Sequence, residues 1–121
     1  MTYEYKATLR AIHDGDTIRV LLDQGLREYR DMAIRFYGIN APELRTPEGV
    51  TARDHLVALI GSETALIVRT IKDAADKYGE RWDGKVWLES AGTWGPDNEF
   101  VVSTPSLNEQ MILDSFAVKY P

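Results

Sequence analysis

Two short polar segments, at 14–17 and 35–43, carry residue types that could hold a divalent metal ion. The first reads Asp-Gly-Asp-Thr and includes Asp16, and the second includes Asn40. Side-chain oxygens from these two residues, together with a backbone carbonyl, suit Ca²⁺ or Mg²⁺ better than zinc. The two segments therefore predict a site for a hard, oxygen-ligated cation.

The second segment also supplies a guanidinium and a carboxylate. Arg35 can hold a phosphate through paired hydrogen bonds and stabilise charge that builds up on it. Glu43 can orient or deprotonate a water molecule. Gly15 is expected to permit a tight turn that brings Asp14 and Asp16 together. With a metal ion, these groups are what phosphodiester hydrolysis requires.

Each of these residues also has an ordinary structural explanation. Asp-Gly-Asp is common in plain turns, and an arginine in a strand is usually solvated or ion-paired. Asn40 is an ordinary turn residue, and Glu43 could be surface charge. Only the occurrence of all of them together favours the catalytic interpretation.

Three expected strands position the two segments. Apolar and polar residues alternate over Tyr3–Ile12, over Thr17–Asp23 and over Arg27–Ile39, as in strands with one buried face. Short turns separate these strands, so we expect an antiparallel meander. A helix should follow, with Thr46 as its N-cap, Pro47 in its first turn and Gly61 at its C-terminus.

The rest of the chain alternates between β patterns and turns and ends in a second helix. We expect a strand over Glu63–Ile71, a polar hairpin or loop over Asp73–Gly84, a strand over Lys85–Ala91, a turn over Gly92–Asn98, a short strand over Glu99–Ser103, and a helix opened by a capping box at Ser106–Glu109. This order predicts an α+β fold that is mainly β. It fits a five-stranded Greek-key barrel of the OB type, with one helix between strands three and four and another at the C-terminus. We expect residues 1–121 to form a single domain.

Charge is distributed unevenly along the 121 residues. The net charge is −5, but residues 1–72 hold ten basic and ten acidic residues, so the whole surplus of acid lies in residues 73–121. A protein that grips nucleic acid through a broad basic face would have a different balance. Composition therefore argues against bulk electrostatic binding and leaves room for a small phosphate site.

Cysteine is absent, which excludes a disulfide scaffold, a thiolate metal site and a thiol nucleophile. The N-terminal residues lack the apolar region of a signal peptide, and no apolar stretch is long enough for a membrane span. We therefore expect a cytoplasmic protein without membrane contact.

Four blocks of the sequence resemble the staphylococcal nuclease-like (thermonuclease) family. Asp-Gly-Asp-Thr-Ile-Arg-Val at 14–20 and Ile-Arg-Phe-Tyr-Gly-Ile-Asn-Ala-Pro-Glu at 34–43 carry the strongest likeness. Asp-Lys-Tyr-Gly at 76–79 resembles a third family block, and 106–117 resembles the family's Asn-led helix. The resemblance implies an OB barrel and Ca²⁺-dependent cleavage of DNA or RNA. It also implies a single-stranded substrate and a monomeric enzyme.

The resemblance also implies a role for each matched residue. The implied metal ligands are Asp16, Asn40 and the Ala41 carbonyl, with Asp14 behind them. The implied catalytic residues are Arg35 on the phosphate and Glu43 on the attacking water.

Two positions depart from the family pattern. Asn40 stands where the best-known members have Asp, so we expect weaker Ca²⁺ binding. Glu80 follows the Lys-Tyr-Gly sequence where the family has its second phosphate-binding arginine, and Arg81 comes one residue later. Arg81 is a candidate replacement for that arginine, and Tyr78 is a candidate for stacking on a base.

Other residues and other functions fit parts of the pattern. We expect Trp82, Trp87 and Trp94 in the core, His13 outside the catalytic set, and His55 on the helix surface. The departures at Asn40 and Glu80 also permit a catalytically weak or inactive module that binds nucleic acid or protein. A structural component of a phage or mobile element is compatible with the compact, acidic chain.

Overall fold

Alternating apolar residues in the first third of the chain produce three neighbouring strands. The computed structural model describes residues 2–71, 81–97 and 99–120, and it contains β1 (Thr2–Asp14), β2 (Thr17–Asp23) and β3 (Tyr29–Phe36). β2 pairs antiparallel with both β1 and β3. The meander expected from the sequence is confirmed, and β2 has the predicted bounds.

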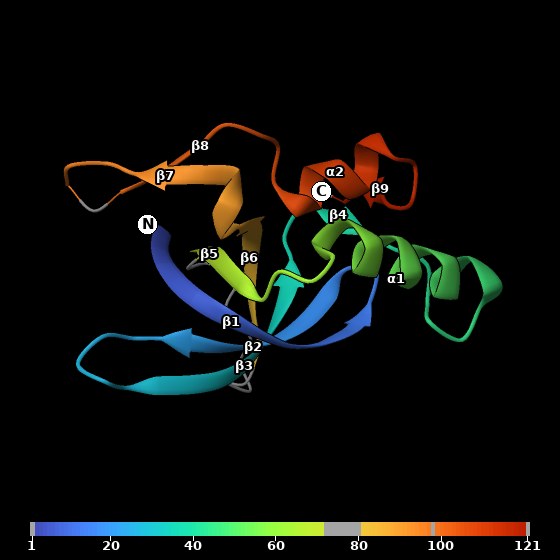
Figure 1. Ribbon diagram of the computed structural model, residues 1–121. Coiled ribbons are helices and arrows are strands. Elements are labelled where there is room, and N and C mark those ends of the chain that lie inside the picture. The colour runs from blue at the N-terminus through green and yellow to red at the C-terminus, as the bar shows by residue number, and fades with distance from the viewer. Residues whose placement is uncertain (1, 72–80, 98, 121) are drawn as a thin grey trace.

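Two further strands close the sheet into a barrel (Figure 1). β5 (Ala65–Ile71) pairs antiparallel with β1 and with β6 (Arg81–Leu88), and β6 completes the closure by pairing in parallel with β3. The barrel order is β1-β2-β3-β6-β5. Its interior is filled by apolar side chains, among them Ile18, Val20, Met32, Ile34, Phe36, Leu66, Val68 and Val86.

Helix α1 (Pro47–Ile60) packs against the barrel through one apolar stripe. The Thr46 hydroxyl accepts a hydrogen bond from the Gly49 N–H, and Gly61 follows the last turn with a positive φ of 64°. Ala52, Leu56 and Ile60 are buried. α1 follows β3 and β4 in the chain and precedes β5.

Several short elements surround the barrel. They are β4 (Ile39–Asn40), the 3-10 helix η2 (Glu89–Ala91), β7 (Gly92–Trp94), β8 (Phe100–Val102), α2 (Leu107–Leu113) and β9 (Val118–Lys119). β7 and β8 form a hairpin that projects from the barrel, and β9 pairs with β4 beside α2 (Figure 1). None of the helices in the described ranges is long and apolar enough to cross a membrane.

Several expected boundaries were wrong. The third strand does not continue to Ile39, because Gly38, with φ of 83°, turns the chain after Phe36. The polar loop expected up to Gly84 ends earlier, since Arg81 already belongs to β6; its residues 73–80 lie outside the described part of the chain. The strand expected to reach Ala91 ends at Leu88, and the expected turn begins instead with strand β7.

Long-range pairing explains these differences. Residues 81–84 are polar or glycine apart from Trp82, yet they pair with β3, and Trp82 packs against the core. The aromatic residues Trp87 and Phe100 form a second small core with Ile67, which fixes the β7–β8 hairpin on the outside of β5 and β6. Trp82 and Trp87 thus pack as predicted, whereas Trp94 remains 36% exposed.

Asn108, which is 1% exposed, ties α2 to the barrel. Its amide nitrogen donates to the carbonyls of Tyr37 and Gly84, and its amide oxygen accepts from the Val86 N–H at 3.1 Å. The Ser106 hydroxyl starts the helix by accepting from the Glu109 N–H, as the capping box predicts. The buried Asn108 side chain therefore satisfies one backbone group at Tyr37, after β3, and two on β6.

Replacing Asn108 by Ala should destabilise the fold strongly. It would leave the buried Val86 N–H and the Tyr37 carbonyl without this partner and would remove one of the two donors to the Gly84 carbonyl, so we expect a loss of about 3 kcal/mol. Urea unfolding followed by circular dichroism measures this. Leu113→Ala on the same helix, at a 66% exposed position, is the control and should change stability little. Equal effects of the two variants would contradict the assigned role of Asn108.

His55 links α1 to the segment after α2, so the prediction that it is a surface residue of the helix was wrong. Its Nε2 lies 2.7 Å from the Asp114 Oδ2, and its ring stacks on Phe116 with centroids 4.0 Å apart. The side chain is 25% exposed. These contacts hold the turn at 114–116 against α1.

Removing His55 should change the titration of Asp114. Hydrogen bonds from His55 and then Gln110 lower the pKa of Asp114 below its ordinary value. A lowered pKa stabilises the fold above that ordinary value, and this contribution disappears as the pH falls through the folded-state pKa. His55→Ala should therefore raise the pKa of Asp114, as measured by the ¹³C shift of its carboxyl group. Gln110→Ala should raise it less, and an unchanged titration in His55→Ala would contradict the pairing.

Candidate functional site

Asp16 lies at the centre of the candidate site, in the turn between β1 and β2. Its side chain is only 9% exposed. The Oδ2 atom accepts from the Ala41 N–H at 2.9 Å, and the Oδ1 atom accepts from the Thr17 hydroxyl at 3.2 Å. The contact with Ala41 joins residues 25 positions apart in the chain, one from each of the two predicted segments.

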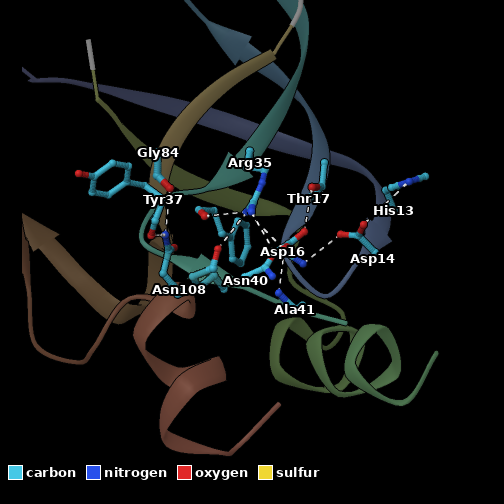
Figure 2. Close-up of polar contacts among 12 residues, drawn as sticks. His13, Asp14, Asp16, Thr17, Arg35, Tyr37, Asn40, Ala41, Gly84 and Asn108 are labelled. Atoms are coloured by element: carbon cyan, nitrogen blue, oxygen red, sulfur yellow. Dashed lines mark hydrogen bonds and ion pairs between the residues drawn. The ribbon is translucent and has the colours of Figure 1, made fainter. Parts of the chain in front are cut away.

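Arg35 reaches the same carboxylate from the end of β3 (Figure 2). Its Nη1 lies 3.3 Å from the Asp16 Oδ2, and its Nη2 donates to the Asn40 Oδ1 at 3.3 Å. Nη1 also donates to the carbonyls of Phe36 and Ile39. One guanidinium therefore connects the two side chains predicted to bind a metal ion.

Gly15 has a different role from the one expected. It does not belong to the residues with positive φ, so its turn does not need the conformational freedom of glycine. A Cβ at this position would instead lie 2.9 Å from the Ala41 Cβ and 3.0 Å from the Ala52 Cβ. Glycine is required because the turn packs directly against the 40–41 segment and against α1.

Burial dominates the electrostatics of Asp16. It raises the pKa of the Asp16 carboxyl, and the neighbouring Asp14 raises it further through hydrogen bonding and like charge. The Ala41 N–H and the Arg35 guanidinium act in the opposite direction. Asp14 also accepts from the Asp16 N–H at 3.0 Å, so the two carboxylates lie next to each other in the turn.

Glu43 was predicted to belong to the site, but its described contacts are with Arg45 and the start of α1 and not with Asp16, Arg35 or Asn40. Its carboxylate accepts from the Arg45 Nε at 2.6 Å, and the side chains of Arg45 and Glu43 are 83% and 67% exposed. The Glu43 carbonyl accepts from Thr46, and a Cβ at Gly49 would overlap that carbonyl. Its backbone is thus packed against the start of α1, while its side chain extends into solvent with Arg45.

Arg81 and Tyr78 are the two other residues that the sequence analysis suggested for the site, and only Arg81 lies in the described ranges. Arg81 begins β6 directly opposite Ala33, whereas the residue opposite Arg35 is Asp83. Tyr78 lies outside the described residues. The position of Arg81 is therefore two residues along the strand from the Arg35 row.

Two hollows flank the cluster. One, of about 150 Å³, is lined by Arg35, Tyr37, Asp83 and Tyr120. The other, of about 300 Å³, borders Asn40 and Ala41 and is lined by Pro42, Phe116 and Val118. Sequence reasoning missed Tyr37 and Tyr120, because pairing of β4 with β9 brings the C-terminal tyrosine to this place. It also missed the Thr17 hydroxyl, although the Asp-Thr pair was visible in the motif.

The candidate ligands are oxygen atoms, which a hard cation prefers, but few of them carry a negative charge. Asp16 and Asn40 offer side-chain oxygens, and Arg35 holds both of them close together. Within the described ranges, no group of three His, Cys, Asp or Glu side chains is arranged to hold a metal ion. A cation here would depend on one or two carboxylates and on neutral oxygens, as Ca²⁺ sites permit.

No protein-family model matches the chain, and no curated protein matches it in sequence. The site must therefore be judged by its own geometry.

Gly15→Ala should disturb both the fold and the cluster. The added methyl group meets two Cβ atoms that cannot rotate away, so we expect a loss of about 1–3 kcal/mol. Ala52→Gly removes one of the two obstacles but costs about 1 kcal/mol in helix propensity. The double variant should therefore be more stable than the sum of the two single changes predicts. Strict additivity in thermal unfolding would contradict the close packing of Gly15.

Proposed function

We propose that this chain is a Ca²⁺-dependent nuclease that hydrolyses phosphodiester bonds of DNA or RNA, on an OB-type barrel of the staphylococcal nuclease-like family. The observation that carries the proposal is the convergence of Asp16, Arg35, Asn40 and Ala41 from three separate segments. A turn with no chemical role would not need a buried carboxylate. The barrel order, with β3 and β6 parallel, supports the OB-type interpretation.

The proposed metal ligands are the Asp16 carboxylate, the Asn40 amide oxygen and the Ala41 carbonyl. When bound there, Ca²⁺ would supply positive charge to a phosphate oxygen. Arg35 would bind the same phosphate, because it lines the hollow that Tyr37 and Tyr120 also line. Glu43 would have to exchange Arg45 for a water molecule in order to act as the base. Because that ion pair is exposed, little energy opposes the exchange.

A second candidate is a module that binds a polynucleotide strand without cleaving it. The Glu43–Arg45 pair favours this candidate, since it removes the proposed base from the cluster. The two functions share Arg35 and the hollow beside it. They differ in whether Glu43 matters.

Cleavage of single-stranded DNA distinguishes the two functions. Purified wild type should cleave at millimolar Ca²⁺ and not in EDTA. We expect a loss of about 10²–10³-fold in rate for Arg35→Ala and about 10²–10⁴-fold for Glu43→Ala. Arg53→Ala, which removes an exposed cation on α1, is the control and should retain activity. Absence of cleavage by wild type would refute the nuclease, and binding that depends on Arg35 would then support the module.

Asn40→Asp tests the metal ligands separately. An added carboxylate next to Asp16 should tighten Ca²⁺ binding, as measured by calorimetry. Gln24→Glu adds the same charge on the turn between β2 and β3 and should leave the affinity nearly unchanged. An equal gain in both variants would mean that general charge, and not ligation by residue 40, is responsible.

A further inference from the structure

Arg19 and Arg81 lie in one row across the outer face of the barrel, with only Ala33 between them. Arg19 is opposite Ala33 in the β2–β3 ladder, and Ala33 is opposite Arg81 in the β3–β6 ladder. Directly opposed side chains share one face of a sheet. Since adjacent strands are about 4.8 Å apart, the two arginines start about 10 Å from each other with a methyl group between them.

This row lies two residues along β3 from Arg35, a residue of the candidate site. Arg35 follows Ala33 by two residues on β3, so both lie on the outer face, while Ile34 between them is buried. Two residues of a strand span about 7 Å. Consecutive phosphates of an extended single strand are separated by a comparable distance.

We propose that Arg19 and Arg81 bind the phosphate next to the one held by Arg35. The preferred substrate is then a strand with at least two consecutive phosphates, and a mononucleotide would leave this row unused. This inference rests on the proposed function of the Arg35 site. It gives Arg81 a role at the neighbouring nucleotide in place of the scissile phosphate.

The surroundings of Arg19 suit an exchangeable anion. The Arg19 Nε lies 2.7 Å from the Asp31 Oδ1, and the two side chains are 49% and 52% exposed. An exposed pair of this kind contributes little, so a phosphate can replace Asp31 at low cost.

Binding of thymidine trinucleotides in EDTA tests the proposal without cleavage. The probe has two phosphates, and its analogue carries a neutral methylphosphonate in place of one of them. Wild type should bind the two-phosphate probe about tenfold more tightly. Its plot of log affinity against log salt concentration should be steeper by about 0.7. The double variant Arg19→Ala/Arg81→Ala should bind both probes equally, whereas Arg53→Ala should behave like wild type.

A second pair of variants leaves both arginines in place. Ala33→Glu puts a carboxylate between them and should abolish the difference between the probes. Ala33→Gln, similar in size and neutral, should preserve most of it, and circular dichroism confirms folding of both. The proposal is overturned if the double variant keeps the full difference, or if Arg53→Ala or Ala33→Gln loses as much as its test variant.

The outcome is separable from that of the nuclease assay. If wild type cleaves DNA but binds the two probes equally, the second phosphate site is refuted and the nuclease stands. If wild type never cleaves but shows the difference between probes, the site is supported and the nuclease fails.

Discussion

The buried carboxylate of Asp16 is the constraint from which the site geometry follows. A charge that is this poorly solvated needs donors, and here the Ala41 N–H, the Thr17 hydroxyl and Arg35 supply them. Those donors come from the 40–41 segment, from the start of β2 and from the end of β3. The turn at Gly15 can approach them because no side chain stands between it and Ala41. Satisfying one carboxylate therefore aligns the segments that carry every other candidate ligand.

The turn between β3 and β4 is held from two sides by different side chains. Arg35 donates to the carbonyls of Phe36 and Ile39, and Asn108 donates to the carbonyl of Tyr37. The first side chain belongs to the site and the second to α2. Because β4 leaves the barrel at this turn and pairs with β9, the same contacts place the end of the chain beside Arg35. Packing of α2 and geometry of the site are thus coupled through one short segment.

Local signals in the sequence predicted the features that local forces determine. β2, the caps of α1 and the start of α2 were predicted because alternation and capping act over a few residues. β6 begins where only pairing with the distant strand β3 decides, and composition at 81–84 indicated a loop. In the site, motif spacing predicted that Asp16, Arg35 and Asn40 would meet. It did not predict the orientation of Glu43, since an ion pair with Arg45 within the same loop decides that orientation.

The raised pKa of Asp16 indicates that this carboxylate is present for a reason other than the stability of the fold. Burial makes the folded state bind a proton more readily than the unfolded state, so stability falls as the pH rises through the interval between the two pKa values. The ionised form of this carboxyl is therefore less favourable in the folded state than in the unfolded state. An asparagine could accept from the Ala41 N–H without this disadvantage, so a purely structural turn has no need of the charge. A negative oxygen beside an arginine and an amide oxygen is useful where a cation and a phosphate must be brought together, and perturbed carboxyls of this kind concentrate at functional sites. The same reasoning reconciles the acidic chain with the proposed polyanionic substrate: recognition would rest on a few arginines placed by strand register, with no need for a broad positive surface.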